Sequence, residues 1–350
     1  MTDNSLSSNS TNNFNILRLL AASLVVYSHS YGLSIGSYEL EPLKLLTGYF
    51  TFGHLAVAIF FVISGYLITI SWNRKPIFLI FCWKRFLRIY PGMMAAILFS
   101  VFIIGPIATS LNLNDYLASI PYLQIIKGMV VLGQSNLPGV FINNTYPNAV
   151  NASLWTLFWE AKMYFITAIL GLTGILKMRW PIVYITLFAI VITYFKLTLP
   201  IIDFFVIDYS VYYLMGTLFA IYNNSIMYRS TLLAPFFLIW ILSFKTPFFT
   251  LLTTVFLPYS IMYLALEAKV VLQKLLEMGD FSYGVYIYAF PIQQLIVHLF
   301  QNEISPIKLF SISFPITIIC SYFSWNFIEK KALDIKNIDI NKIRMKIWSV

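Results

Sequence analysis

Charged residues are scarce in this sequence, and cysteine and histidine are scarcer still. Only 11% of the 350 residues are charged and 59% are hydrophobic, whereas soluble domains carry about 25% charged residues. So few charges cannot cover a water-exposed surface, and the soluble classes are therefore excluded. The two cysteines, Cys82 and Cys320, share no motif and predict no disulfide framework. With only three histidines in the chain, no metal site is expected either.

The hydrophobic residues are gathered in runs long enough to cross a bilayer. Runs of about 20 apolar residues predict ten spans, at 15–33, 50–72, 92–110, 152–172, 181–199, 205–222, 231–245, 248–266, 281–300 and 307–328. We therefore expect an all-α, polytopic integral membrane protein with about ten transmembrane helices. Its membrane domain would cover 15–329, between a polar N-terminus (1–14) and a basic tail (330–350). The N-terminus lacks the features of a signal peptide, so the first span is expected to be retained.

Lysine and arginine are distributed unevenly over the predicted connections. With a cytoplasmic N-terminus, sixteen of these residues fall on the inner side and five on the outer side, which is the bias that orients membrane proteins. The outer residues are Lys44, Lys127, Lys196, Lys245 and Lys308. Both termini and the connection 73–91 are therefore predicted to be cytoplasmic, and 111–150 to lie outside. The net charge of +9 fits attraction to anionic lipid and does not indicate nucleic acid.

The first predicted span carries two ionisable residues on one face. Arg18 and His29 are eleven positions apart, which on an α-helix is three turns plus about 20° and a rise of about 16 Å. Arg18 lies close enough to the inner end for its side chain simply to reach the interface. His29 lies about 21 Å from that end, where polar groups face the protein interior or a water-filled cavity. We interpret His29 as functional, with a satisfied core histidine as the alternative.

A second intramembrane charge lies in the segment NASLWTLFWEAKMYF. Glu160 is expected about 12 Å below the outer surface, close to the depth predicted for His29. A carboxylate at that depth could orient an imidazole and raise its basicity. The alternative pairs Glu160 with Lys162, but residues two apart point to different faces of a helix. Trp155 is a candidate glycan contact, and an interfacial aromatic belt explains it more simply.

The first inner connection, NRKPIFLIFCWKRFLRIYP, is strongly basic. Lys84, Arg85 and Arg88 are expected on a short helix that ends before Pro91, and Arg74 approaches from the other end. Guanidinium groups suit phosphate oxygens, so these residues are candidates for phosphate binding, Arg85 with Arg88 above all. The alternative is ordinary positive-inside bias, which suffices for any one of them taken singly.

Six segments, in order along the chain, resemble the landmarks of one known family. They are NILRLLAASLVVYSH, FFVISGYLI, KRFLRIYP, SLWTLFWEAKMYF, FSYGVYIYAFP and SWNFIEKKAL. Each segment is a weak signal by itself. Their common order over about 15–333 is specific, and it resembles the acyltransferase-3 family of integral membrane acyltransferases.

The resemblance implies ten membrane helices, acetyl-coenzyme A as the donor, and transfer of the acyl group to an acceptor at the other face. The family's Arg-x10-His pair falls on Arg18 and His29, and its inner arginine motif on Arg85 and Arg88. The acidic residue of its closing motif falls on Glu329, for which the simplest role is pairing with a basic residue of the coenzyme site. The resemblance also implies a bacterial cytoplasmic (inner) membrane and an O-antigen or exopolysaccharide acceptor.

The chain departs from the family pattern at three positions. Asn15 stands where many relatives have Asp, Ala289 replaces a common His, and Lys331 replaces a usual Pro. A carboxylate role at position 15 and a histidine role at position 289 are therefore not expected. Only about twenty residues follow the last predicted span, so we expect no SGNH hydrolase-like domain of the kind fused to some relatives.

Together these observations predict an O-acetyltransferase of a cell-envelope glycan. His29 would act as general base on a sugar hydroxyl, or as a transient acyl carrier. Arg18 would hold the surroundings of His29 or contact the donor. Because the connection 111–150 is polar and nearly uncharged, a neutral or weakly charged sugar is expected there, with Tyr146 stacking on it. The lipid bilayer and acetyl-coenzyme A are the other expected partners. Whether the protein forms a homo-oligomer is left open by the sequence.

Two other functions fit part of the pattern. A transporter or flippase of lipid-linked sugars would have many helices and intramembrane charges, but it leaves the inner arginine pair and the buried histidine unexplained. An acyltransferase acting on a small cytoplasmic-side or lipid acceptor is a variant of the first interpretation. The sugar and the hydroxyl that are modified do not follow from the sequence.

The predicted orientation can be tested by labelling single cysteines in intact cells. Cysteine placed at Lys127 should react with a membrane-impermeant maleimide, because 111–150 is predicted outside. Cysteine placed at Lys75 should react only after the membrane is permeabilised. Equal labelling of both positions from outside would contradict the orientation.

Overall fold

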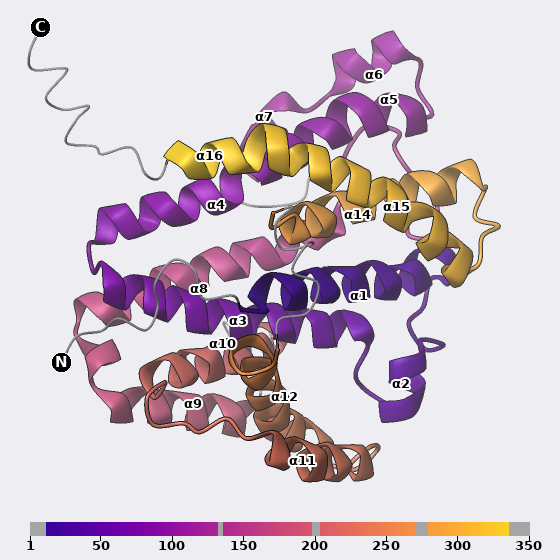
Figure 1. Cartoon of the computed structure of the whole chain (residues 1–350). Helices are drawn as coiled ribbons and strands as arrows, with labels where there is room; N and C mark the ends of the chain where they lie inside the picture. Colours follow the sequence, from indigo (N-terminus) through magenta and orange to yellow (C-terminus); the bar gives the residue numbers. More distant parts are fainter. Residues whose placement is uncertain (1–11, 132–135, 198–203, 270–278, 336–350) are drawn as a thin grey trace, which may run out of the picture. The chain divides into compact units, whose positions relative to one another are not determined.

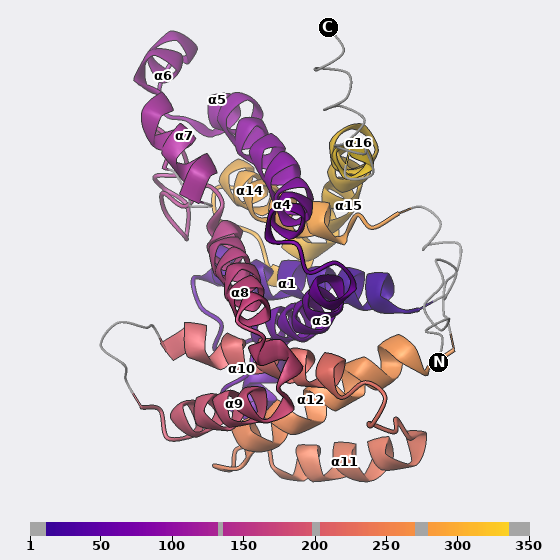
Figure 2. The ribbon, with the colours of Figure 1, turned by 90° about the vertical axis from the view of Figure 1, so that its left-hand side faces the viewer.

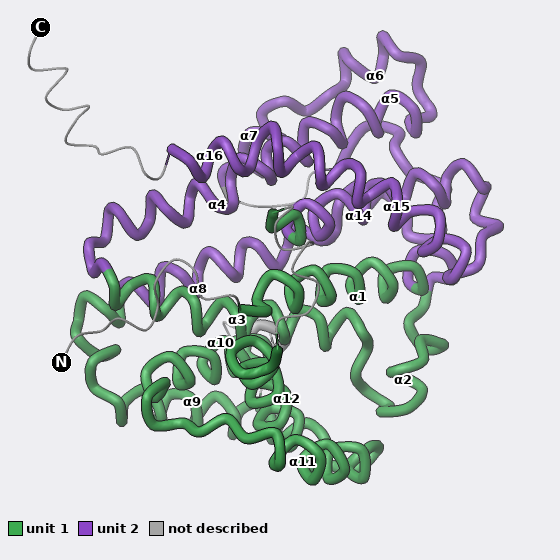
Figure 3. The backbone as a smooth tube through the Cα atoms, viewed as in Figure 1, with its two compact units in different colours: residues 1–31, 37–74, 169–282 green, residues 32–36, 75–168, 283–350 purple. Residues whose placement is uncertain are grey.

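The computed structural model describes residues 12–131, 136–197, 204–269 and 279–335. Regular structure in these ranges is helical, apart from an isolated antiparallel bridge between Thr109 and Val140. The chain divides into two compact units, which are described separately (Figure 3). Unit 1 comprises residues 1–31, 37–74 and 169–282, and unit 2 comprises 32–36, 75–168 and 283–350.

Unit 1 is built around two long helices that lie side by side, α3 (Phe52–Arg74) and α10 (Phe204–Ile221) (Figures 1 and 2). Helices α9 and α12 also pack against α10. The other helices of this unit are α1 (Phe14–Ile35) up to Tyr31, α2 (Pro42–Thr47), the end of α8 (Trp155–Leu172), η3 (Ile175–Lys177), α9 (Arg179–Tyr194), α11 (Ser230–Leu242) and α12 (Phe249–Leu266).

Unit 2 contains two long composite helices, each continued through a π-helical turn. The first runs through α4 (Phe78–Phe99), η1 (Ser100–Ile104) and α5 (Gly105–Ala108), and the second through α15 (Pro306–Ser324), η4 (Trp325–Glu329) and α16 (Lys330–Ile335). Both η4 and α16 pack against α4. The remaining elements are α6 (Leu113–Ser119), α7 (Tyr122–Val131), η2 (Ala152–Leu154), most of α8, and α14 (Ser282–Leu299).

The all-α membrane fold predicted from the sequence is confirmed. Each of the ten predicted spans overlaps a described helix. By length and composition, five described helices could cross a membrane, and three shorter apolar helices accompany them. The five are Phe14–Ile35, Phe52–Arg74, Phe78–Ala108, Phe249–Leu266 and Pro306–Ile335. Residues 1–11 of the predicted N-terminus and 336–350 of the predicted basic tail lie outside the described residues.

The prediction that a short helix ends before Pro91 is wrong. Helix α4 begins at Phe78 and continues through Pro91 to Phe99. Proline removes one backbone donor and usually breaks a helix in water, but in a membrane helix neighbouring groups can compensate for the missing bond. The carbonyl that loses its helical donor is that of Leu87, four positions before the proline; two positions before it, the Tyr283 hydroxyl donates to the carbonyl oxygen of Ile89 at 2.7 Å. Lys84, Arg85 and Arg88 therefore lie on a long continuous helix and not in a separate connection.

The stretch 111–150 is not irregular throughout, since it contains α6 and α7. Its last part is held by two buried or half-buried amides. Asn144 Nδ2 donates to the Gln294 side chain at 2.8 Å, and Gln294 Nε2 donates to the carbonyls of Tyr146 and Ala149 at 2.7 and 2.8 Å. Gln294 is fully buried, and bonding its whole amide removes the cost of burying it.

Glycine allows α3 and α10 to approach closely. A Cβ atom built on Gly65 would lie 2.0 Å from the carbonyl oxygen of Tyr213, and one on Gly216 would lie 2.1 Å from that of Val62. Both distances are far below van der Waals contact, so only glycine fits at either position. Close approach through small residues is a common means of packing helices in lipid, where the hydrophobic effect does not drive helices together.

We therefore expect Gly65→Ala and Gly216→Ala to destabilise the folded protein. The added methyl group must push two backbones apart, and such overpacking costs about 1–3 kcal/mol. The fraction of protein that stays monodisperse in detergent after heating measures the loss. Val191→Leu is the control, because Val191 is 46% exposed on α9 and can be enlarged without a clash. Equal thermal profiles for all three variants would contradict the close-packing argument.

Candidate functional site

The residues predicted to be functional are divided between the two units. Unit 1 holds Arg18, His29 and Arg74, and unit 2 holds Lys84, Arg85, Arg88, Tyr146, Trp155, Glu160 and Glu329. Each group is described within its own unit. No group of three or more His, Cys, Asp or Glu residues in the described ranges could hold a metal ion.

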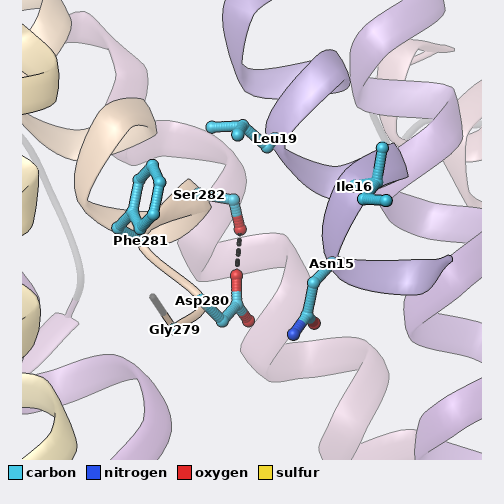
Figure 4. A pocket seen from close by; sticks show the side chains of 7 residues that line it. All are labelled: Asn15, Ile16, Leu19, Gly279, Asp280, Phe281 and Ser282. Atoms are coloured by element: carbon cyan, nitrogen blue, oxygen red, sulfur yellow. Dashed lines mark hydrogen bonds between the residues drawn. The ribbon is translucent and has the colours of Figure 1, made fainter. Parts of the chain in front are cut away.

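Arg18 forms an ion pair with Asp280, a residue that the sequence analysis did not single out. The Arg18 Nη1 and Asp280 Oδ2 atoms are 3.1 Å apart, and the two side chains are 17% and 11% exposed. Ser282 donates a hydrogen bond to the other carboxylate oxygen of Asp280 (Figure 4). The pair joins the first turns of α1 to the residue that precedes α14. Asp280 directly precedes the FSYG segment in the sequence, and its place beside this family landmark could have identified it as a candidate.

Asn15 lies opposite Asp280 in a small pocket at the start of α1 (Figure 4). The pocket measures about 10 Å³ and is also lined by Ile16, Leu19 and Phe281, so it has room for about one water molecule. The preceding residue, Asn13, donates from its side chain to the carbonyl of Leu264 at 2.8 Å. The beginning of α1, the end of α12 and Asp280 therefore meet at one end of unit 1.

His29 lies on α1 and is half-buried, with its Nδ1 shielded from solvent. The adjacent residue, Ser28, hydrogen-bonds Glu41, and both carboxylate oxygens of Glu41 accept from the backbone N–H of Phe52 at 3.0 Å. The Glu41 carboxylate therefore meets the positive end of α3, where a negative charge is stabilising. Burial raises the pKa of Glu41, although these hydrogen bonds and Lys44 act in the opposite direction. The backbone beside His29 is thus fixed to the start of α3.

Arg85 and Glu160 share one tyrosine in unit 2. The Arg85 guanidinium lies 5.9 Å from the centre of the Tyr164 ring and 5.8 Å from that of Phe81. The Tyr164 hydroxyl donates a hydrogen bond to Glu160 Oε1, one helical turn away on α8. Glu160 thereby belongs to the surroundings of Arg85. Lys162 instead places its ammonium 4.1 Å from the rings of Phe158 and Trp159.

Tyr283 connects the second arginine to the two glutamates. The Arg88 guanidinium lies 5.8 Å from its ring centre, and the Tyr283 side chain interacts electrostatically with Glu329 and Glu160. Glu329 is buried in the π-helical turn η4, where it accepts a hydrogen bond from Ser324 at 2.8 Å. A Cβ atom on Gly92 would lie 2.7 Å from the Tyr283 ring and 3.2 Å from Glu329. The glycine therefore leaves room for both side chains beside α4.

We call Arg85, Arg88, Glu160, Tyr283 and Glu329 the arginine cluster. It brings together four residues that the sequence singled out, and it adds Tyr283. Both guanidinium groups lie over tyrosine faces, at 5.9 and 5.8 Å from the ring centres of Tyr164 and Tyr283. Such forks match phosphate oxygens. The cluster can therefore hold a polyphosphate.

The other predicted residues are described one by one. Lys84 is half-buried on α4, and Arg74 is exposed at the end of α3 in unit 1. Trp155 and Tyr146 are 43% and 45% exposed, and the Tyr146 ring centre is 6.2 Å from that of Phe290. Exposed aromatic side chains fit a surface contact of either kind, with glycan or with the membrane interface.

A buried acid–base pair in unit 1 was missed by the sequence analysis. His54 Nε2 on α3 lies 2.9 Å from Asp208 Oδ2 on α10, and the side chains are only 9% and 3% exposed. Phe50 and Tyr209 flank the imidazole, with ring centres 4.0 and 5.0 Å away. Both residues lie inside predicted spans, and the rule that selected Glu160, an ionisable residue in an apolar segment, would have selected them too.

Comparison with known proteins places these features in a family. The acyltransferase-3 family, described as an acyltransferase domain, matches residues 11–326. The chain is 30% identical over 336 residues to an "O-acetyl transferase" of Shigella phage Sf6, covering 92% of this chain and 96% of the phage protein. It is also 41% identical over 99 residues to "Nodulation protein 10" of Rhizobium leguminosarum bv. viciae, covering 27% of this chain and 25% of that protein. No solved structure matches. The chain therefore belongs to the acyltransferase-3 family of integral membrane acyltransferases.

Proposed function

We propose that this protein transfers an acetyl group from acetyl-coenzyme A to a hydroxyl group of a cell-envelope glycan. The donor binds from the cytoplasm, both termini face the cytoplasm, and the acceptor arrives from the outer side of a bacterial inner membrane. The name of the phage relative, "O-acetyl transferase", supports the reaction type. An O-antigen or exopolysaccharide is the acceptor class that the family suggests.

The observation that carries this proposal is the arginine cluster. Coenzyme A bears a diphosphate and a ribose phosphate, and Arg85 and Arg88 present two guanidinium groups three positions apart on α4. Their flanking tyrosines fix the orientation of both groups. Arg74 and Lys84 add positive charge on the predicted inner side.

The reaction is balanced without an external proton donor. The acceptor hydroxyl gives its proton to His29 and its oxygen forms a bond to the thioester carbonyl carbon. The carbon–sulfur bond then breaks, and the departing thiolate takes the proton back from His29. In the variant of this scheme, His29 carries the acetyl group between donor and acceptor. Arg18, through Asp280, would hold α1 and hence His29 in position.

Glu160 takes a different role from the one first expected. Its hydrogen bond with Tyr164 supports a position on the donor side, where it would orient the tyrosine beside Arg85. Glu329 would act similarly on Tyr283 and Arg88. Both glutamates are proposed as positioning residues, since each is argued to act through a tyrosine.

His29→Ala should abolish acetylation while the protein still accumulates in the membrane. A general base contributes about 10²- to 10⁴-fold to the rate. The variant is expressed in a strain that lacks the gene, and NMR of the purified glycan counts its alkali-labile acetyl groups. Glu160→Gln should lower the acetyl content less completely.

His298→Ala is the matched control, since it makes the same chemical change at a histidine on α14 outside the proposed site. Normal acetylation by His29→Ala at normal abundance would end its proposed role. A glycan of shortened chain length in the gene-deleted strain would favour the flippase instead. An unchanged acetyl content in that strain would point to a different acceptor.

Arg85→Ala and Arg88→Ala should each raise the acetyl-coenzyme A concentration needed for half-maximal turnover. A charge-assisted hydrogen bond contributes about 1.5–3 kcal/mol, which is about 10- to 150-fold in affinity. Initial rates of the purified protein in nanodiscs, titrated with donor at fixed glycan, measure the effect. The requirement for glycan should not change.

Arg179→Ala controls for general positive charge on the predicted inner side. Arg179 lies in unit 1 and places its guanidinium 5.4 Å from the Tyr222 ring centre, so it has an aromatic partner as Arg85 and Arg88 do. If Arg179→Ala weakens donor binding as much as the other two variants, the arginines act only as topology signals.

A further inference from the structure

A large cavity in unit 1 is not used by the proposed donor site. It measures about 640 Å³ and is formed by three connections that are distant in sequence. These are the link from α2 to α3, the end of α9, and the turn between α11 and α12. Its side chains include Tyr49, Thr193, Tyr194, Lys196, Lys245 and Thr250. A cavity of about 300–1,000 Å³ is the usual size of a small-molecule site.

The cavity lies at the end of unit 1 opposite to the Arg18–Asp280 pair. Helix α1 has Arg18 near its beginning and is followed by α2, whereas α3 begins beside the cavity and ends at Arg74. Counting spans places all three connections on the side away from the N-terminus. Under the proposed orientation, the cavity therefore opens on the outer face. An even number of predicted spans separates each of these connections from the next one along the chain. If one span had been miscounted, one connection would lie on the opposite side of the membrane and could not meet the others.

Two lysines give this cavity a positive charge. The Lys196 ammonium lies 5.9 Å from the centre of the Tyr49 ring, and a Cβ atom on Gly48 would lie 3.7 Å from Cγ of Lys245. No acidic side chain is among the described residues that line the cavity. Lys44, another predicted outer lysine, differs from these two in having an acidic partner, because its ammonium lies 2.6 Å from a Glu39 carboxylate oxygen.

The backbone holds both lysines in an uncommon conformation. Lys196 has φ 50° and Lys245 has φ 59°, in the left-handed region that residues other than glycine and asparagine seldom adopt. Each residue follows a helix end, at α9 and at α11. Glycine would adopt this conformation at a lower cost than lysine.

The rest of the lining suits a saccharide. Tyr49 and Tyr194 offer aromatic faces, and the threonines offer hydroxyl groups that both donate and accept. Burial, together with the neighbouring Asp208, raises the pKa of Tyr49 to about 12, so its hydroxyl remains protonated at physiological pH. Asp208 is not among the lining residues, and its Oδ2 lies 2.9 Å from His54 Nε2. Among the described lining residues, the two lysines are the charged side chains.

We propose that this cavity binds a sugar unit of the acceptor that carries an anionic group, either a carboxylate or a phosphate. This inference rests on the proposed function and names the substrate class of its acceptor side. It differs from the neutral or weakly charged sugar expected at the connection 111–150. An uncharged acceptor would bring no counter-charge to the two lysines, which have none among the described lining residues, and a lipid tail would meet polar walls.

Direct binding to the full-length protein in nanodiscs tests the proposal. Saturation-transfer NMR and calorimetry are run with three probes: trigalacturonate, glucose 6-phosphate and the neutral galactotriose. At least one anionic probe should bind at least 10-fold more tightly than the neutral one, and the preference should weaken as salt is raised. Tighter binding of trigalacturonate identifies a uronic acid, and tighter binding of glucose 6-phosphate identifies a phosphorylated sugar.

Lys196→Gln and Lys245→Gln should each weaken binding of the preferred probe about 10-fold or more. Lys308→Gln is the control, because Lys308 is another predicted outer lysine but lies in unit 2. The comparison among probes on the unaltered protein decides the question even if a variant fails to fold. Equal binding of the neutral probe, or no binding of either anionic probe, would overturn the proposal.

His29→Ala separates this inference from the proposed function, since binding in the cavity does not require catalysis. If the His29→Ala protein binds the anionic probe normally, the cavity is a glycan site whatever the reaction is. If the unaltered protein acetylates glycan but binds no anionic probe, the cavity inference fails and the proposed function stands.

Discussion

A charged or polar group inside a membrane protein must be bonded within the protein, because lipid offers it no partner. This constraint positions the helices described here. The Arg18–Asp280 pair fixes the beginning of α1, Glu41 fixes the beginning of α3, and His54–Asp208 joins α3 to α10. Removing one partner would leave the other buried and unsatisfied, which costs more than the pair itself contributes. These ionisable side chains therefore determine contacts between segments, whereas buried hydroxyls such as those of Ser30 and Thr186 bond the carbonyl four residues earlier in their own helix.

The same constraint explains which features could be predicted from the sequence. Apolar length alone locates a span, because crossing the bilayer needs a set number of helical residues, and all ten predicted spans are helices. The interaction partners of the polar residues could not be predicted in this way. Arg18 and Asp280 are 262 residues apart in sequence, and no local pattern couples them. Glu160 was assigned to His29 on depth along a helix, and this pairing stays a prediction, because the two residues belong to different units. Within unit 2, the Tyr164 hydroxyl donates a hydrogen bond to Glu160.

Irregular helix geometry accounts for the other features that were not predicted from the sequence. A proline predicts a helix end in water, and Pro91 does not end α4. Two π-helical turns, η1 and η4, lie within the two composite helices of unit 2, and η4 carries Glu329. Turns of this kind widen the helix and recur at functional sites. In η4 the wider turn lets Ser324 reach Glu329, five positions away, at 2.8 Å. No periodicity in the sequence marks such a turn.

The arrangement of charge also bears on how an acyl transfer could take place inside a membrane. The proposed reaction returns its proton to the thiolate, so no net proton enters or leaves, and His29 begins and ends each cycle in the same state. A half-buried imidazole needs no water-filled path for such a cycle. Charge is needed instead where polar substrates are recognised. Positive side chains lie at both proposed recognition sites: arginines on α4, and lysines around the cavity of unit 1. Guanidinium forks bind phosphate oxygens in a fixed, bidentate geometry, whereas single ammonium groups on flexible stems act as point charges. Under the proposed function, the arginines suit the phosphates of one donor and the lysines suit acceptors of varied shape.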